Sequence, residues 1–221
     1  MHTHTHGPES PAQTEGRLIR WASFYDVSVS IMTLGRVRRL RTLTVDRTLL
    51  KPGERVLDVG CGTGGVTIPA KLQVGKNGRA AGIDPAPEMI ALARRKASRA
   101  GLEIDFRVGV IESLPFLDGT FDAVTSSLMM HHLPEHVQVR GLAEIRRVLK
   151  PGGRLLIADM MRPGSSSLER LASLVLHHGH GIQFGIEDLP ELLKGAGFEE
   201  IKKLEDRFLT IGFVRATKPA A

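Results

Sequence analysis

Between residues 54 and 161 the chain alternates short apolar runs with longer segments in which apolar residues recur every three or four positions. Short apolar runs are typical of buried strands, and the three-to-four spacing is typical of helices with one apolar face. The expected strands are 54–60, 79–84, 103–109, 120–129 and 153–161, and the expected helices include 87–101 and 135–150. Strands that alternate with helices predict a parallel, doubly wound sheet with helices on both faces.

The last third of the chain departs from this alternation. Segments 165–178 and 187–197 are helix-like, and two strand-like runs follow them at 199–206 and 208–218. Two strands so close in sequence leave no room for a crossover helix, so they must pair antiparallel. We therefore expect an α/β fold of the Rossmann-like type, with a seven-stranded, mostly parallel sheet that ends in an antiparallel hairpin.

The region before the alternating part is organised differently. Residues 1–14 are polar, contain Gly and Pro, and are expected to be a disordered tail. Residues 15–50 show helical spacing, and we expect two helices, with a break near 28–33, that cover the site. Residues 51–221 are expected to form one domain, in which 165–186 is the substrate lid.

Composition and targeting signals point to a cytoplasmic protein. No apolar run is long enough to span a bilayer, and the N-terminus has no apolar signal-peptide core. The single cysteine, Cys61, excludes an internal disulfide and suits a reducing compartment.

The net charge of +6 is unevenly distributed, since residues 35–47 carry five arginines and one aspartate. A solvated helix face, a nucleic-acid contact and an anionic surface such as phospholipid headgroups would each explain this stretch. The stretch has no interleaved aromatic residues and no DNA-binding motif, so we expect no nucleic-acid partner. The solvated face and a peripheral membrane contact through 35–47 both stay open.

The first expected strand leads into VLDVGCGTGG, which has four glycines between Gly60 and Gly65. Glycine lets the backbone approach a ligand closely, and open α/β sheets bind ligands at the carboxyl ends of their strands. The spacing fits both G-x-G-x-x-G and G-x-G-x-G, so the glycines alone do not select a cofactor. Asp58 would repel a pyrophosphate and attract a cationic amine or sulfonium, which favours S-adenosyl-L-methionine over a dinucleotide.

Several segments together resemble the class I S-adenosylmethionine-dependent methyltransferases. They cover roughly residues 50 to 200 in the family's order: VLDVGCGTGG, GIDPAPEMIALAR, ESLPFLDGTFDAV, HHLPE, RRVLKPGGRLLIADM and LLKGAGFEEI. Residues 24–50 are more loosely similar to the menaquinone/ubiquinone C-methyltransferase group (methyltransferase type 11 domain) and to bacterial phosphatidylethanolamine N-methyltransferases. The resemblance implies an enzyme that uses S-adenosyl-L-methionine and releases S-adenosyl-L-homocysteine.

The resemblance also implies which loop residues meet the cofactor. Backbone at Gly60, Cys61, Gly62 and Gly64 would approach its methionine part and ribose. Asp58 would favour its amino group, directly or through water. The alternative for Asp58 is capping of the backbone amides of its own loop.

Further cofactor contacts are implied at the ends of the next strands. Asp84 would accept hydrogen bonds from both ribose hydroxyls, with an ordinary turn residue as the alternative. Pro85 would pack on the adenine, and Ser127 would lie beside the methionine part. Val110 and Ile111 would border the adenine edge, although many relatives carry Asp or Asn where this chain has Val110, and valine cannot accept a hydrogen bond from the adenine amino group.

Methyl transfer is an in-line displacement that depends mainly on alignment and on the exclusion of water. A base is needed only when the acceptor starts protonated. His131 and His132 follow the fourth strand, His178 lies in the expected lid, and Tyr25 precedes the fold. These four are the candidate catalytic or acceptor-contacting residues; ordinary packing of Tyr25 and solvent exposure of His178 are the alternatives. We expect no metal site.

Apolar and methionine side chains in the expected helices and lid favour a small apolar or amphiphilic acceptor, such as a quinol, a phenol or another natural product. Phosphatidylethanolamine N-methylation is one alternative. A nicotinamide-dependent dehydrogenase and a catalytically silent cofactor-binding interaction protein are alternatives of other classes. The sequence leaves the oligomeric state open.

Overall fold

A computed structural model describes residues 29–31, 33–162 and 184–220 of the chain. The expected disordered tail, the helices expected before residue 29, Tyr25, His178 and most of the expected lid lie outside these residues. The division into N-terminal helices, one methyltransferase domain and a lid therefore stays a prediction.

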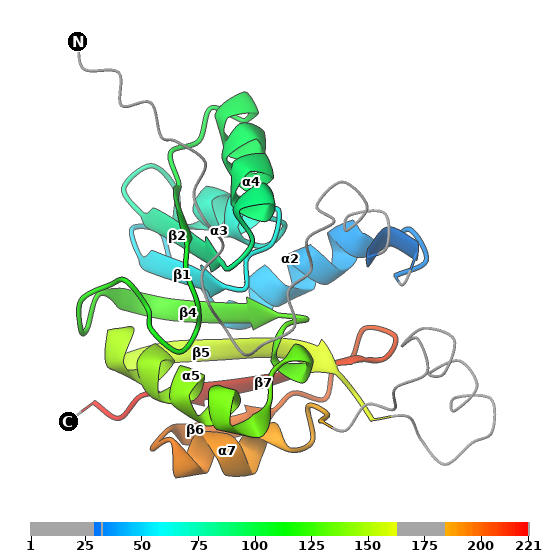
Figure 1. The fold of residues 1–221 in the computed structure, drawn as a ribbon, viewed down its shortest axis with the longest axis vertical. Helices are drawn as coiled ribbons and strands as arrows, with labels where there is room; N and C mark the ends of the chain where they lie inside the picture. Colours follow the sequence, from blue (N-terminus) through cyan, green and yellow to red (C-terminus); the bar gives the residue numbers. More distant parts are fainter. Residues whose placement is uncertain (1–28, 32, 163–183, 221) are drawn as a thin grey trace.

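One sheet with the strand order β3-β2-β1-β4-β5-β7-β6 organises the described residues (Figure 1). Strands β1 to β5 pair in parallel, and β7 is antiparallel to both β5 and β6, which confirms the expected fold class. The strands are β1 (Arg55–Val59), β2 (Arg79–Asp84), β3 (Asp105–Val108), β4 (Phe121–Ser127), β5 (Leu149–Met160), β6 (Glu199–Lys203) and β7 (Ile211–Thr217).

Strand β5 begins four residues earlier than the expected 153, because Leu149 already pairs with Phe121 and the register shifts between Phe121 and Ala123. The helices at 37–48, 87–99, 135–148 and 189–195 lie where the three-to-four spacing predicts them, whereas those at 67–74 and 130–132 were not expected. They are α2 (Val37–Thr48), α3 (Thr67–Val74), α4 (Pro87–Arg99), α5 (Glu135–Val148), α7 (Leu189–Gly195) and the short 3₁₀ helix η1 (Met130–His132).

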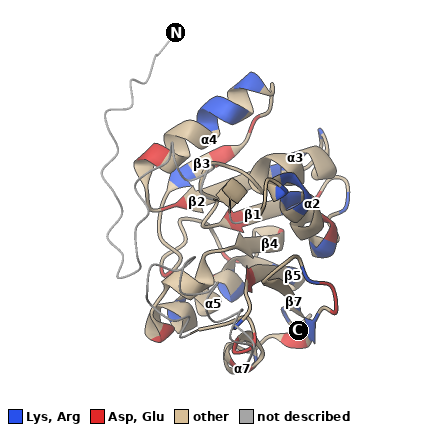
Figure 2. Ribbon diagram, turned by 90° about the vertical axis from the view of Figure 1, so that its right-hand side faces the viewer, with Lys and Arg blue, Asp and Glu red and all other residues tan. Residues whose placement is uncertain are grey.

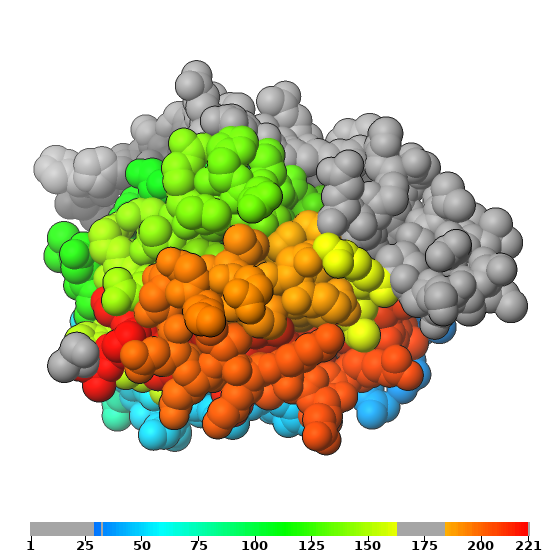
Figure 3. Space-filling model, turned by 90° about the horizontal axis from the view of Figure 1, so that it is seen from below, coloured from blue at the N-terminus to red at the C-terminus, as the bar shows by residue number. Residues whose placement is uncertain are grey.

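Helices α5 and α7 cover one face of the sheet. Val137, Leu142 and Ile145 of α5 are fully buried against alternate strand residues such as Leu57 and Ile157. Figure 3 shows the atoms of α5, in yellow-green, beside those of α7, in orange. Strand β6 is the edge strand of the sheet on this side. The exposed positions of β6 carry Glu and Lys, which discourage pairing with another strand.

Helices α2, α3 and α4 cover the opposite face. Leu40 of α2 packs in a cluster with Leu156 and Phe213 of the sheet. The buried residues of α2 recur at helical spacing and so lie on one side of the helix. The arginines of α2 lie outside this side. The break before α2 lies at residues 33–35, later than the expected 28–33, because Leu34 and Gly35 adopt positive φ angles of 51° and 75°.

The strand order reverses direction at β1, since the chain runs from β1 to β2 on one side and returns to β4 on the other. Val59 at the end of β1 pairs with Ile83 of β2 and with Ser126 of β4. In open α/β sheets the crevice at such a switch point binds the ligand. The loops after β1, β2, β4 and β5 therefore meet at one edge and define the candidate site.

Candidate cofactor and acceptor site

The glycine loop after β1 turns back over the end of β2. The amides of Gly60 and Cys61 both donate to the carbonyl of Ile83, at 3.0 and 2.8 Å. Gly60 has φ +73°, and a Cβ placed there would lie 2.5 Å from Cγ of Met129. Only glycine fits this position, because the loop and the segment after β4 approach each other so closely.

Asp84 ends β2 with its carboxylate toward the loop. Its Oδ2 accepts a hydrogen bond from the Gly62 amide and its Oδ1 accepts one from the Ala86 amide, both at 3.0 Å. Each oxygen keeps a second lone pair, which is what bidentate binding of a ribose diol requires. Burial raises the pKa of Asp84 to about 6, although the hydrogen bonds from these two amides lower it.

Asp58 lies beneath the loop rather than beside it, and only 2% of its surface is exposed. Its Oδ2 accepts from the Thr67 hydroxyl at 2.6 Å and its Oδ1 from the Thr125 hydroxyl at 3.0 Å. Burial raises the pKa of Asp58 to about 6, and the two hydroxyls oppose the shift. The Asp58 carboxylate thus binds Thr67 in the first turn of α3. This role resembles the expected alternative, in which Asp58 caps protein groups, except that Thr67 lies in α3 and not in the glycine loop. Contact with a cofactor amino group stays a prediction.

The side chain of Cys61 points into the core, where it packs with Ile90, Ala93 and Phe106. Burial, together with the negative charges of Asp58 and Asp84, holds the pKa of the thiol well above its ordinary value. A neutral, buried thiol is inert. Any cofactor contact at this position therefore falls to backbone atoms.

Two cationic side chains hold the glycine loop from outside, and the sequence did not reveal either. Lys96 of α4 donates from Nζ to the hydroxyl of the buried Thr63 at 2.8 Å. The guanidinium of Arg41 from α2 lies over Gly65, where a Cβ would come within 2.5 Å of its Nε. Gly64 meets the core instead, since a Cβ there would lie 3.1 Å from the ring of Phe106.

Residues 109–120 carry the positions expected at the adenine edge. Val110 is half-buried and bridges to Ser113, whereas Ile111 is buried against Gly141 of α5. Pro85, expected to pack on the adenine, is half-buried directly after Asp84.

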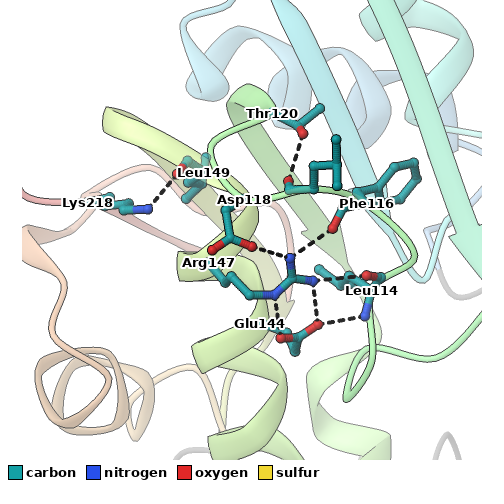
Figure 4. A network of polar contacts seen from close by, with 9 residues as sticks. Leu114, Phe116, Asp118, Thr120, Glu144, Arg147, Leu149 and Lys218 are labelled. Atoms are coloured by element: carbon teal, nitrogen blue, oxygen red, sulfur yellow. Dashed lines mark hydrogen bonds and ion pairs between the residues drawn. The ribbon is translucent and has the colours of Figure 1, made fainter.

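Arg147 of α5 holds this segment in place (Figure 4). It donates to the carbonyls of Leu114 and Phe116 at 3.0 and 2.8 Å, and it pairs with Asp118 and Glu144. Glu144 in turn accepts from the Leu114 amide at 2.8 Å. The wall that contains Val110 and Ile111 is therefore anchored to α5.

Strand β4 ends at Ser127, which is half-buried and pairs with Ala158. The next residue, Leu128, has a positive φ of 56°, an unfavourable backbone conformation for leucine. Such strain is often found at functional sites. Here the turn leads directly into Met129 and the 3₁₀ helix that carries both candidate histidines.

His131 is paired with a buried carboxylate that the sequence analysis missed. Asp159 of β5 is 1% exposed; it accepts from the His131 amide at 3.2 Å and from the Met160 amide at 2.7 Å, and its Oδ1 contacts Nδ1 of the His131 ring. A carboxylate beside Nδ1 favours the tautomer that carries its proton there, which leaves Nε2 as the acceptor. The ring of His132 lies against that of His131, with the centroids 3.9 Å apart.

These residues fit S-adenosyl-L-methionine better than a dinucleotide. The strand ends carry three carboxylates, Asp58, Asp84 and Asp159, which disfavour a diphosphate and favour a sulfonium and an amine. The glycines let the loop fold this tightly, because a Cβ at Gly60 or Gly65 would collide with Met129 or Arg41. Asp84 offers the geometry that two ribose hydroxyls need.

Comparison with known proteins agrees with this chemistry. A family model described as a methyltransferase domain matches residues 56–153. The chain is 30% identical to a ubiquinone/menaquinone biosynthesis C-methyltransferase of Escherichia fergusonii, over 81% of this chain and 80% of that one. It is 33% identical to a 2-phytyl-1,4-naphtoquinone methyltransferase of Synechococcus elongatus, over 76% and 72% of the two chains.

Other relatives are matched over a smaller share of their length. A demethylmenaquinone methyltransferase of Bacillus cytotoxicus is 36% identical over 63% of this chain, which spans 58% of that relative. Among solved structures, an S-adenosylmethionine-dependent methyltransferase from Aquifex aeolicus has a TM-score of 0.69 at 23% identity, over 86% of this chain and 98% of that one. That likeness supports the fold.

The chain belongs to the family of S-adenosyl-L-methionine-dependent methyltransferases. Within this family, the relatives reported above by sequence are methyltransferases of quinone-type compounds. The expected family and the expected cofactor are thereby confirmed.

Proposed function

We propose that the chain methylates a small quinol- or phenol-type acceptor, with His131 as the general base. The observation that carries this proposal is the pairing of His131 with the buried Asp159 where β4 and β5 end. The names of the relatives support an acceptor of the quinone type. Such an acceptor carries a hydroxyl that must lose its proton to become a strong nucleophile.

S-adenosyl-L-methionine supplies, when bound, a methyl group on a positively charged sulfur. Asp84 binds the ribose hydroxyls, and the glycine loop lies against the rest of the molecule through its backbone. Asp58 acts through its charge, because its carboxylate is buried beneath the loop and is satisfied by two threonine hydroxyls.

His131 takes the hydroxyl proton of the acceptor on Nε2. Asp159 keeps the opposite ring nitrogen bonded and stabilises the imidazolium that forms. The resulting phenolate attacks the methyl group either through its oxygen or through the neighbouring ring carbon. When carbon is methylated, that carbon then loses its own proton to water, which restores the aromatic ring as a phenolate. The phenolate oxygen takes back the proton held on His131.

The decisive experiment is an acceptor panel of quinols, phenols, phosphatidylethanolamine and small carboxylates, with release of S-adenosyl-L-homocysteine as the readout. We expect turnover with a quinol or phenol. Turnover with phosphatidylethanolamine alone would favour the phospholipid alternative. Cofactor binding without turnover on any acceptor would favour a catalytically silent protein.

Two variants test the proposed base. His131→Asn is expected to lower kcat by about 10²- to 10⁴-fold while leaving the Kd for the cofactor nearly unchanged. Asp159→Asn should also lower kcat more than KM, and Asp159→Glu should restore part of it if the carboxylate acts by positioning the ring. His136→Asn, on the exposed surface of α5, is the matched control. Full turnover in His131→Asn would exclude His131 as the base.

A further inference from the structure

The arginines of the 35–47 stretch do not form one uniform face. Arg36 lies over the ring of Phe208 at 5.9 Å, Arg41 lies over Gly65, and Arg47 pairs with Asp206. Three of the five arginines thus have contacts within the protein. Arg38 and Arg39 are exposed, and neither forms an ion pair with another described residue.

Two large apolar side chains lie exposed just before these arginines. Ile31 is 67% exposed and Leu34 is 74% exposed. Leu34 also holds a positive φ of 51°, which is unfavourable for leucine. Leu49 and Leu209 also combine a positive φ with exposure, but Leu34 is the most exposed of the three and has Ile31 beside it in sequence, so its side chain is available to a contact outside the described residues.

The turn that presents Leu34 is well ordered by hydrogen bonds. The buried Thr33 donates its hydroxyl to the carbonyl of Val29 at 2.7 Å, and the Gly35 amide donates to the carbonyl of Ser30 at 2.7 Å. The exposure of Leu34 is therefore imposed by a defined backbone rather than by a frayed helix end.

This turn lies beside the candidate site. Figure 1 shows residues 29–36 and the first turn of α2, in dark blue, on the same side of the molecule as the arrowheads of β4 and β5. One turn further along α2, Arg41 contacts the glycine loop, and Leu40 packs in the same cluster as Leu128 at the end of β4. Figure 2 shows the Lys and Arg colouring along α2.

We propose that Ile31, Leu34, Arg38 and Arg39, here called the docking turn, bind a bilayer that contains anionic phospholipid. Aliphatic side chains insert into the boundary between headgroups and acyl chains, and neighbouring arginines pair with the phosphates. The described residues contain no helix that is both long and apolar enough to cross a bilayer. The inference rests on the proposed function in one respect: an amphiphilic acceptor resides in a bilayer.

Vesicle flotation of the full chain tests the docking turn without requiring turnover. We expect binding to vesicles of phosphatidylcholine and phosphatidylglycerol, weaker binding at high salt, and little binding to phosphatidylcholine alone. Arg38→Glu with Arg39→Glu should lower binding by at least about tenfold, because an anionic surface attracts the two arginines and repels the two introduced carboxylates. Arg95→Glu with Arg99→Glu, on the exposed side of α4, changes the net charge equally and should bind like the parent.

A second pair of variants tests the apolar part. Leu34→Asn should weaken vesicle binding several-fold and keep the fold, because asparagine tolerates a positive φ. Leu117→Asn is the control. Leu117 is 83% exposed and lies in the loop before β4, near the amino end of that strand, whereas the candidate site lies at the carboxyl ends. Calorimetry with S-adenosyl-L-methionine should give the same Kd for all of these variants.

Equal binding of the parent to neutral and anionic vesicles would overturn the inference, and so would equal losses in the test and control variants. Tighter binding to duplex DNA than to anionic vesicles, lost in Arg38→Glu with Arg39→Glu, would also overturn it in favour of a nucleic-acid partner. Retained, variant-sensitive vesicle binding in a chain that methylates no acceptor would support the docking turn while refuting the proposed function.

Discussion

Asp84 combines two tasks that depend on its charge. In the free protein its carboxylate holds the Gly62 amide and so shapes the glycine loop. In the proposed complex it also accepts both ribose hydroxyls. Burial makes the charged form costly, as the raised pKa of about 6 shows, and this cost makes the site sensitive to pH.

The affinity for S-adenosyl-L-methionine should therefore depend on pH. Asp84 is mostly ionised above pH 7 and becomes protonated as the pH falls through about 6, so the Kd should rise by up to about tenfold per unit below that value. Calorimetry from pH 5 to 8 measures the effect. Asp84→Asn should weaken binding at neutral pH by about tenfold or more and should reduce the dependence on pH. A pH-independent Kd in the parent would contradict a ribose contact at Asp84.

Gly60 should tolerate no side chain, because two separate costs meet there. Gly60→Ala places a methyl group 2.5 Å from Cγ of Met129 in a backbone conformation with φ +73°. We expect loss of cofactor binding by at least about tenfold together with about 1–3 kcal/mol of stability. Gly75→Ala is the matched control, since Gly75 has the same φ and no atom within 4 Å of its added Cβ. If both variants bind the cofactor like the parent, the close approach to Met129 does not shape the site.

At the level of elements, α5 does more than cover the sheet. Its Glu144–Arg147 pair binds the backbone of the 109–120 segment at Leu114 and Phe116. That segment carries Val110, which offers no side-chain acceptor to an adenine. We therefore expect this segment to contribute a fixed backbone to the cofactor site, and the side chains of α5 hold that backbone in place.

Arg147→Ala should loosen this wall. We expect a loss of about 1–3 kcal/mol in the free energy of unfolding, measured in urea, because two backbone carbonyls and two carboxylates lose their partner. Affinity for S-adenosyl-L-methionine should fall as well, since Ile111 and Val110 lose their anchor. Arg146→Ala is the neighbouring control: Arg146 donates to the Gly197 carbonyl on the exposed surface, and its removal should leave the cofactor Kd unchanged.

At the level of the whole molecule, the doubly wound sheet gathers carboxylates from three strands at one edge. Asp58 is buried and Asp84 is half-buried. Both have pKa values raised to about 6, and the charge of Asp84 contributes to the shift of Asp58. Keeping both carboxylates charged at neutral pH therefore carries an electrostatic cost. A cationic ligand relieves that cost, which couples cofactor binding to stability.

This coupling has a sign that can be checked. Between the unfolded pKa of 3.8 and the folded value of about 6, the folded protein binds more protons at Asp58 and Asp84 than the unfolded chain does. Their contribution to stability therefore falls as the pH rises from about 4 to about 6. We expect S-adenosyl-L-methionine at a fixed concentration to raise the Tm more at pH 7.5 than at pH 5. An equal shift at both pH values would show that the two carboxylates do not sense the ligand.

The fold class and the cofactor were predictable from the sequence. The alternation of apolar runs and amphipathic segments specifies strands and helices, because burial on a sheet or under a helix imposes a fixed spacing on apolar residues. Glycines after the first strand, with Asp58 ahead of them, indicated a close approach to a cationic ligand. Both signals are local and therefore visible in one stretch of chain.

The pairing of His131 with Asp159 was decided by tertiary structure alone. The two residues are 28 positions apart, and nothing in LLIADM marks its aspartate until β4 and β5 lie side by side. The arginines of 35–47 were likewise indistinguishable in sequence, until the packing of α2 gave three of them partners and left Arg38 and Arg39 exposed. Periodicity reports which side of an element is buried, whereas the partners that a buried or exposed charge meets depend on which elements the fold brings together.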